Sequence, residues 1–260
     1  PTFRDAWYAP YKAQRAPMPD DLRTQIAPIH EVVRLLGWPV LEVPGIEADD
    51  AIGTLARVAA AAGHQVIIST GDKDLAQLVT PQITLVNTMT SVVLDEAGVL
   101  GKFGVRPDQF IDYLMLVGDS SDGIPGVPGV GPKTAVKWLS EQGSLEALVA
   151  QADSIKGKTG EKFRDHLPML PMTRELVTIK CDVPLAQAPA DLALHAADAD
   201  ALRQLYAELD FRNWLNELTQ APAAALGSAD AFAFDTETDS LDYLKARLVG
   251  LSFAVRPGEA

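Results

Sequence analysis

The chain has 260 residues, of which 47% are hydrophobic, and its formal net charge is −13 at pH 7. This length and apolar content can bury a core and suit one large domain or two smaller ones. The negative charge argues against a broadly basic nucleic-acid-binding surface. Carboxylates neutralised by bound cations would hide part of that excess from a polyanion, so the charge leaves a nucleic-acid partner open.

Targeting segments and covalent cross-links are not indicated. Apolar runs such as 114–117 are far shorter than the ~20 residues of a membrane span, and the N-terminus has no signal-peptide pattern. We therefore expect a cytoplasmic protein without a membrane partner. A single cysteine, Cys181, excludes an internal disulfide, and the four histidines are too scattered to suggest a zinc site. Any bound metal should therefore have oxygen ligands.

The first half of the chain predicts an α/β layer. Apolar residues at helical spacing predict a helix over 20–36 that ends at Gly37. The apolar run PVLEV (39–43) precedes a second predicted helix over 48–62, and QVIIST (65–70) predicts a buried strand. This strand-helix-strand order implies a parallel pair. Further strands are predicted for ITLVN (83–87) and SVVL (91–94).

The second half predicts a helical layer. Helices are expected over 108–117, 133–142, 145–150, 161–170 and 200–211. A stretch rich in Ala, Pro, Gly and Ser then has the composition of a linker, and the remaining residues predict two strands of a sheet that the chain is too short to complete.

Carboxylates gather in a first motif, GIEADDAIGTLA (45–56), which places Glu47, Asp49 and Asp50 where a helix opens. Helix capping explains one or two acidic residues there, at ~0.3–1 kcal/mol each, but three in four positions exceed that need.

The second motif, IISTGDKDLAQL (67–78), puts Asp72 and Asp74 after an apolar strand, where ligands gather in open α/β sheets. An Asx turn with a helix N-cap explains this motif equally well.

The third motif, GDSSDGIPGVPGVGPKTA (118–135), places Asp119 and Asp122 after a predicted helix. Carboxylates at a helix C-terminus oppose the helix dipole, so capping does not explain them and a compensating cation is expected.

An α/β layer can bring these seven carboxylates into one pocket. Two like charges ~4 Å apart repel by ~4 kcal/mol at an effective dielectric near 20, so the cluster needs cations or protonation. Oxygen ligands alone favour Mg²⁺ or Mn²⁺. Two such ions ~3.5–4 Å apart would activate a water molecule and stabilise the leaving oxygen in phosphodiester hydrolysis.

The glycines and prolines of the third motif predict a tight hairpin between two helices. Gly129 and Gly131 would let backbone N–H groups approach a phosphate, while Lys133 would add a charge and Thr134 a hydroxyl. Such contacts hold a nucleic-acid backbone without reading its sequence. A purely structural turn has the same pattern.

Two further stretches are ambiguous by themselves. The stretch FRDAWYAPYKAQRAPMPDDLR (3–23) interleaves basic residues with aromatic ones, which suits a single strand and equally suits a solvated helix face. The stretch FDTETDSLD (234–242) puts Asp235 and Glu237 on one face of a strand, as in an ordinary strand or in half of a two-metal site.

Together these motifs resemble, over roughly residues 1–217, the 5′ nuclease (flap endonuclease-like) domain of the bacterial DNA polymerase I family. The resemblance implies an α/β fold: a partial parallel-sheet, PIN-like or resolvase-like catalytic core over 1–105, followed by an all-helical helix-hairpin-helix subdomain over 106–217. It also implies a linker over 218–230 and, over 231–260, the truncated start of an RNase H-like 3′-5′ exonuclease domain.

The same resemblance implies two-metal-ion hydrolysis of DNA in RNA primer removal and DNA repair, within a chain that also carries a DNA-directed DNA polymerase. The implied cofactors are two Mg²⁺ or Mn²⁺ ions. We expect a monomer that acts on duplex DNA with a 5′ flap or nick and on single-stranded 5′ ends.

The resemblance also assigns residues. Glu47, Asp49 and Asp50 would serve the first metal ion, and Asp72, Asp74, Asp119 and Asp122 would lie nearer the second. Lys12 and Arg15 would be the catalytic pair that engages the scissile phosphate, with Tyr11 beside them and Arg4 as a further phosphate contact. Gly129, Gly131, Lys133 and Thr134 would hold duplex DNA, in some relatives around a monovalent cation, and Asp235 and Glu237 would form the first proofreading motif.

The chain departs from the family pattern in two places. It has neither the family's first strand with its metal-binding aspartate nor the second aspartate before the FR motif, and it lacks the later proofreading carboxylates. We therefore expect an internal fragment with little or no nuclease activity. The alternative is a non-catalytic DNA-binding module whose acidic groups serve only structure. A phosphatase with Asp235 as nucleophile is disfavoured, because Glu237 stands where that class has a second aspartate.

Overall fold

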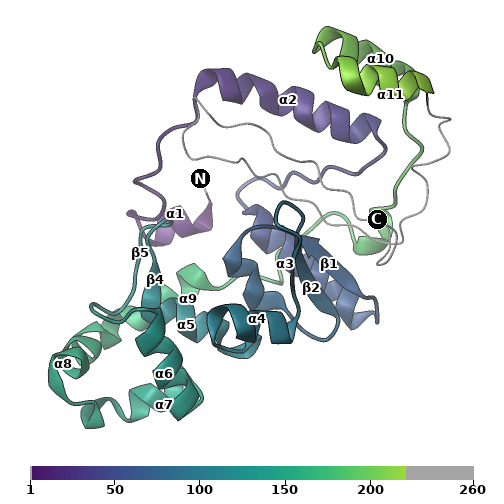
Figure 1. The fold of residues 1–260 in the computed structure, drawn as a ribbon. Helices are drawn as coiled ribbons and strands as arrows, with labels where there is room; N and C mark the ends of the chain where they lie inside the picture. The colour runs from purple at the N-terminus through teal and green to yellow at the C-terminus, as the bar shows by residue number, and fades with distance from the viewer. Residues whose placement is uncertain (1, 221–260) are drawn as a thin grey trace.

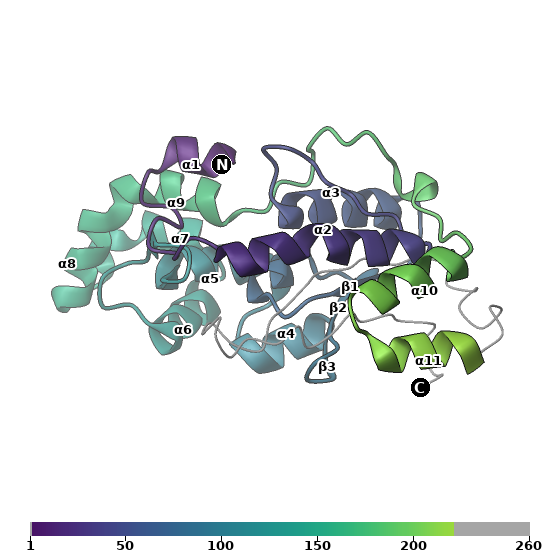
Figure 2. The ribbon, with the colours of Figure 1, turned by 90° about the horizontal axis from the view of Figure 1, so that it is seen from above.

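The computed structural model describes residues 2–220. Most of the predicted linker, the segment 231–260 and with it Asp235 and Glu237 lie outside the described residues. Within them, no helix combines the length and the apolar character that crossing a membrane requires. Figure 1 and Figure 2 show a central α/β layer with a group of helices at one end and the helix pair α10–α11 at the other.

A three-stranded sheet forms the α/β layer, in the order β1-β2-β3. β1 and β2 are parallel, with Ile68 opposite Leu85, and β3 is antiparallel to β2. Ile68, Ile83 and Leu85 are buried, which explains the continuous apolar runs in the sequence. The elements of this layer are α2 (Asp20–Leu35), α3 (Ala48–Ala61), β1 (Val66–Ser69), η1 (Lys73–Leu78), β2 (Ile83–Asn87), β3 (Val92–Leu94) and α4 (Glu96–Phe103).

The expected strand over 39–43 is wrong. These residues form no strand, and the parallel partner of β1 is β2 instead. Pro39 begins the run and Pro44 follows it, and proline has no N–H group to donate to a sheet. The side chains of the run are half-buried or exposed, so burial does not compensate.

Helix α5 (Phe110–Val117) connects the two halves of the molecule, because it contacts α6, α9, the β4 strand and η1. A short hairpin follows it, formed by β4 (Gly118–Asp119) and β5 (Ile124–Pro125). The predicted helices over 133–142 and 145–150 are confirmed as α6 (Pro132–Gln142) and α7 (Leu145–Ala150).

The expected helix over 161–170 is divided. Helix α8 (Gly157–His166) ends before Pro168, and α9 (Leu170–Val177) starts with Pro171 in its first turn. Proline is accepted at a helix start but removes a hydrogen bond from a helix interior, so the chain turns between the two helices.

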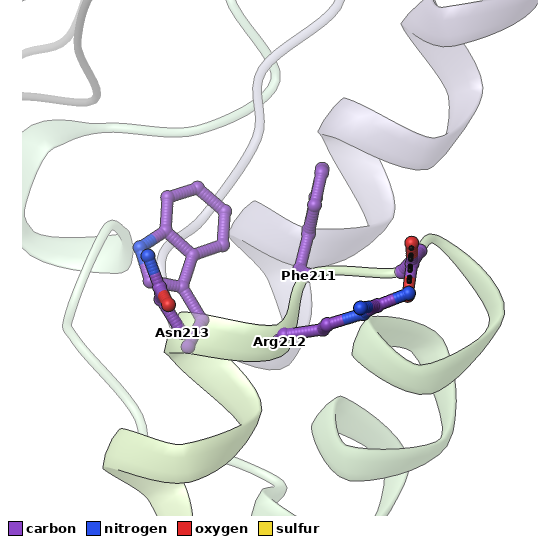
Figure 3. A pocket seen from close by; sticks show the side chains of 5 residues that line it. Phe211, Arg212 and Asn213 are labelled. Carbon is purple, nitrogen blue, oxygen red and sulfur yellow. Dashed lines mark hydrogen bonds and ion pairs between the residues drawn. The ribbon is translucent and has the colours of Figure 1, made fainter.

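A second, smaller apolar cluster lies at the other end of the molecule. Val32 of α2 packs with Leu202 and Tyr206 of α10 (Ala199–Glu208), and α11 (Arg212–Gln220) follows. At the start of α11 is a pocket of ≈ 370 Å³, lined by Asp210, Phe211, Arg212, Asn213 and Trp214. Figure 3 shows these side chains around it. In Figure 1 α11 lies far from α1 (Phe3–Trp7) and from the β4–β5 hairpin, and in Figure 2 α11 and α1 lie at opposite ends of the molecule.

Candidate active site

The N-terminal segment after α1 docks on the β4–β5 hairpin. The backbone N–H of Lys12 donates to the carbonyl oxygen of Asp122 at 2.8 Å. The amide of Gln14 donates to the carbonyl oxygens of Ser120 and Ser121, both at 3.0 Å. This docking brings the basic and aromatic residues of the N-terminal stretch to the acidic third motif.

Asp50 of the first acidic motif lies in a buried ion pair. Arg4 donates to both of its carboxylate oxygens, at 2.7 and 2.8 Å, and a third bond comes from the backbone of Lys180. Arg4 also donates to Oε2 of Glu47 at 3.1 Å. Only 3% of Arg4 is exposed, so in this arrangement it stabilises the fold and cannot present its charge to a phosphate, which corrects the predicted role.

Two N-terminal side chains, Tyr11 and Lys12, each contact both Glu47 and Asp122. The Tyr11 hydroxyl donates to Oε2 of Glu47 at 3.0 Å and lies 3.4 Å from Oδ2 of Asp122. The ammonium of Lys12 lies 3.0 Å from Glu47 and 3.7 Å from Asp122. Arg15 pairs with the other oxygen of Asp122. The first and third motifs therefore meet around Tyr11, Lys12 and Arg15.

Lys12 adopts a strained backbone conformation. Its φ is +52°, in the left-handed region that costs a residue with a side chain roughly 1–2 kcal/mol. The hydrogen bond from its N–H to Asp122 holds it there. Strain of this kind persists where surrounding contacts impose it, and it is common at functional sites.

Lys73 joins the second and third motifs. Its ammonium donates a hydrogen bond to Oδ2 of Asp119 and lies 3.5 Å from Oδ1 of Asp74. Asp72 is the N-cap of η1, where its carboxylate accepts a 2.8 Å bond from the N–H of Asp74. The interpretation of Asp72 as a helix cap is therefore confirmed, while Asp74 and Asp119 face one shared cation.

Asp74 and Asp119 share Lys73, and their pKa values are shifted in opposite directions. Burial raises the pKa of Asp74 to about 7; Lys73 opposes this rise, and the charges of Asp72, Asp119 and Asp122 add to it. Burial acts in the same sense on Asp119, but hydrogen bonds from Lys73 and Ser121 hold its pKa below the usual value. Neighbouring acids with divergent pKa values are typical of functional sites.

The geometry at Asp74 fits a divalent cation. Its Oδ1 is buried and accepts no hydrogen bond, and the Lys73 ammonium lies 3.5 Å from it without donating one. A buried charged oxygen without a donor is costly, and a directly bound cation would offset that cost. Carboxylate oxygens are the ligands that Mg²⁺ prefers, and Asp119 and Asp122 contribute to the field at this point. In their present positions, no three His, Cys, Asp or Glu side chains within residues 2–220 are placed to hold an ion together. The seven-carboxylate ligand set stays a prediction, including Asp49, which is half-buried in the first turn of α3.

A glycine-rich turn is present at the start of α6, and its binding of phosphate stays a prediction. Gly129 has a φ of +86°, and Gly131 is the N-cap of α6. The turn's own bonds use the N–H groups of Val130 and Thr134. A Cβ added at Gly131 would meet nothing within 4 Å, so the space inside the fold does not require glycine there. Lys133 is exposed next to it.

Lys73 was missed as a site residue by the sequence reasoning. The available signal was its position in GDKD, where a lysine between two aspartates opens a turn after a buried strand. The contact with Asp119 joins residues 46 positions apart, so the motif alone does not reveal it.

Two family models match the chain in succession. The N-terminal resolvase-like domain of 5′-3′ exonucleases matches residues 1–104, and the C-terminal SAM-fold domain of 5′-3′ exonucleases matches residues 105–200. DNA polymerase I of Pseudomonas aeruginosa is 46% identical over 299 aligned residues, covering 100% of this chain and 33% of that protein. DNA polymerase I of Mycobacterium tuberculosis is 41% identical, covering 92% of this chain and 27% of that protein. The chain spans a third or less of the length of these relatives.

Solved structures show the same fold. T5 5′-exonuclease with bound zinc ions has a TM-score of 0.61 at 19% identity, covering 84% of this chain and 78% of that chain. The catalytic core of Rad2 in complex with DNA substrate has a TM-score of 0.55 at 16% identity, covering 85% and 75%. The fold and the site thus define a resolvase-like α/β layer joined to a SAM-fold helical half. Because the two family models together span residues 1–200, the chain belongs to the 5′-3′ exonuclease family. The family and fold class expected from the sequence are confirmed.

Proposed function

We propose that this chain is the 5′-3′ exonuclease and flap endonuclease part of a bacterial DNA polymerase I, and that it hydrolyses DNA phosphodiesters with Mg²⁺ or Mn²⁺. The single observation that carries the proposal is the buried oxygen of Asp74, which has no hydrogen-bond donor and lies among Asp72, Asp119 and Asp122. Such a site is poorly built for stability alone and well built for a divalent ion.

Asp74, Asp119 and Asp122 would hold the ion, and Glu47 would serve a second one. When bound, the ions supply an activated water molecule and stabilise charge on the leaving oxygen. The rest of the work belongs to the chain's own side chains. Lys12 and Arg15 are 26% and 55% exposed, so their charges reach solvent at the edge of the acidic cluster, where they can bind the scissile phosphate.

Tyr11 positions its neighbours and does not act as a base. Burial, together with the charges of Glu47 and Asp122, raises the pKa of Tyr11. Its hydroxyl therefore stays protonated and donates to Glu47. This bond orients the Glu47 carboxylate beside Lys12.

DNA is the proposed substrate, with a 5′ flap, a nick or a single-stranded 5′ end. T5 flap endonuclease is known in a complex with DNA and metal ions, and Rad2 in a complex with DNA substrate, and both share this fold. Gly129, Gly131, Lys133 and Thr134 at the start of α6 would hold the duplex backbone. The proposal places the protein in the bacterial cytoplasm, acting as a monomer in primer removal and repair.

The test is cleavage of a duplex with a 5′ flap, labelled at its 5′ end. Any short labelled product should depend on Mg²⁺ and be absent with EDTA, and its yield should be low, in line with the weak activity that the sequence predicts for this chain. The double variant Asp119→Asn, Asp122→Asn should bind the duplex but lose cleavage, and calorimetry should show that its Mg²⁺ binding is lost. Duplex binding without cleavage and without Mg²⁺ binding by the unaltered protein would overturn the proposal in favour of a non-catalytic DNA-binding module.

A further inference from the structure

We propose that Lys73 is a built-in counter-cation of the acidic site: its ammonium takes the place of a divalent ion between Asp74 and Asp119 and leaves when such an ion binds. The inference rests on the proposed function, because it requires a divalent-ion site at these two carboxylates. It gives a role to a side chain that the proposed chemistry does not use.

The first argument comes from how the two carboxylates use their oxygens. Oδ1 of Asp119 accepts bonds from the backbone N–H groups of Ser121 and Asp122, at 2.8 and 3.3 Å, and from the Ser121 hydroxyl. Oδ2 of Asp119 accepts its bond from Lys73. Oδ1 of Asp74 is buried without a donor, 3.5 Å from the same ammonium. The two oxygens left over for a cation therefore converge on Lys73.

The second argument is the contrast in exposure between the cation and its ligands. The Lys73 side chain is 43% exposed, whereas Asp74 and Asp119 are 19% and 4% exposed. Lysine has a flexible four-carbon stem and a strongly hydrated head group, so it can turn into solvent while the core stays closed. Asp119 is fixed by its bonds to the hairpin backbone. Freeing these two oxygens from their present cation thus requires only the Lys73 side chain to move.

The third argument is electrostatic. A divalent ion and an ammonium at the same two oxygens repel each other strongly, so each excludes the other. Without Lys73, the carboxylate charges of the metal-free site would be less fully neutralised. The metal-free state would therefore become less favourable. Removing the lysine should therefore tighten ion binding, whereas a merely structural lysine would leave it unchanged or weaken it.

The experiment measures Mn²⁺ binding by electron paramagnetic resonance, without DNA and without cleavage. Four variants are compared with the unaltered protein: Lys73→Met, Lys73→Gln, Lys73→Arg and Lys137→Met. Lys73→Met and Lys73→Gln should bind Mn²⁺ on the order of tenfold more tightly. Lys73→Arg keeps the charge and should keep the affinity. Lys137 is an exposed lysine of α6 paired with Glu141, and its replacement is the control that should change nothing.

The outcomes separate this inference from the proposed function. If the unaltered protein binds Mn²⁺ and both neutral variants bind it equally or more weakly, the counter-cation role is wrong while the metal site stands. If the unaltered protein binds no Mn²⁺, the metal-dependent function fails and the inference fails with it. Lys73→Gln keeps a polar end group. It therefore provides the Mn²⁺ measurement if circular dichroism shows that Lys73→Met does not fold.

Discussion

Arg4 and Asp50 form a two-pronged ion pair whose members are 3% and 0% exposed, although they lie 46 positions apart in the chain. Arg4 comes from α1 and Asp50 from the first turn of α3. The pair therefore ties α1, and with it the segment that carries Tyr11 and Lys12, to the start of α3.

Replacing Arg4 by alanine should strongly destabilise the protein. It leaves the buried Asp50 carboxylate without its partner, and losing one partner of a buried pair costs about 3–5 kcal/mol. The measurement is urea unfolding followed by circular dichroism. Arg106→Ala removes a pair with Asp108 whose side chains are 55% and 67% exposed, and it should cost far less stability than Arg4→Ala. Equal effects of the two substitutions would contradict the assignment of Arg4.

The left-handed backbone at Lys12 predicts a difference between two substitutions. Both Lys12→Gly and Lys12→Ala remove the ammonium from Glu47 and Asp122, but only glycine adopts a φ of +52° without strain. Lys12→Gly should therefore be more stable than Lys12→Ala by about 1 kcal/mol. Thermal unfolding of the two variants under the same conditions tests this. An alanine variant as stable as the glycine variant would show that the docking of the segment does not enforce the strain.

Asp74→Asn should stabilise the metal-free protein at neutral and alkaline pH. Because the folded-state pKa of about 7 lies above the ordinary value of 3.8, the folded state binds the proton more tightly than the unfolded chain. Ionisation of Asp74 therefore costs stability as the pH rises from about 4 to 7, and the cost remains above pH 7. At pH 8 the neutral asparagine should add about 1–3 kcal/mol.

The measurement for Asp74 is urea unfolding with EDTA present, at pH 5 and at pH 8. The gain from Asp74→Asn should shrink toward pH 5, where Asp74 is already mostly protonated in the folded protein. The exposed Asp153 provides the control, since Asp153→Asn should show no such pH-dependent gain. A constant gain at both pH values would indicate that the effect is not one of charge.

Gly131 and Lys133 should affect DNA binding without affecting the fold. A Cβ at Gly131 meets no atom within 4 Å, and Lys133 is exposed, so stability should stay within about 0.5 kcal/mol for Gly131→Ala and Lys133→Ala. Both should weaken duplex binding, and Lys133→Ala should also lower the slope of log affinity against log salt by about 1. Fluorescence anisotropy at several salt concentrations measures this. Gly101→Ala, at a glycine of α4 with equally free space and no positive φ, should leave binding unchanged.

Elements with a strong local pattern could be predicted from the sequence. Helix α2 and helix α7 follow from apolar spacing, and β1 follows from its β-branched run. The need for a cation near Asp119 and Asp122 also followed from local physics, because carboxylates after a helix oppose its dipole. The structure meets that need with Lys73, Lys12 and Arg15.

The partners themselves could not be predicted, because they depend on contacts between distant segments. The Arg4 side chain was expected to contact phosphate. It is buried instead, and it donates hydrogen bonds to Asp50 and to two backbone carbonyl groups. The run 39–43 has a strand-like composition, yet Pro39 and Pro44 remove the donors that pairing needs. The tertiary environment decided the outcome for Arg4, whereas the two prolines decided it for the run 39–43.

The contacts of Arg4 with the carbonyl groups of Leu176 and Thr178 set an order of events during synthesis. These residues lie 172 and 174 positions after Arg4. At the usual ~5–20 residues per second, a ribosome takes roughly nine to thirty-five seconds to make the chain between them. Until then a nascent chain lacks the two carbonyl groups that accept bonds from Arg4, so the contacts around the Arg4–Asp50 pair should be completed only after α9 has emerged.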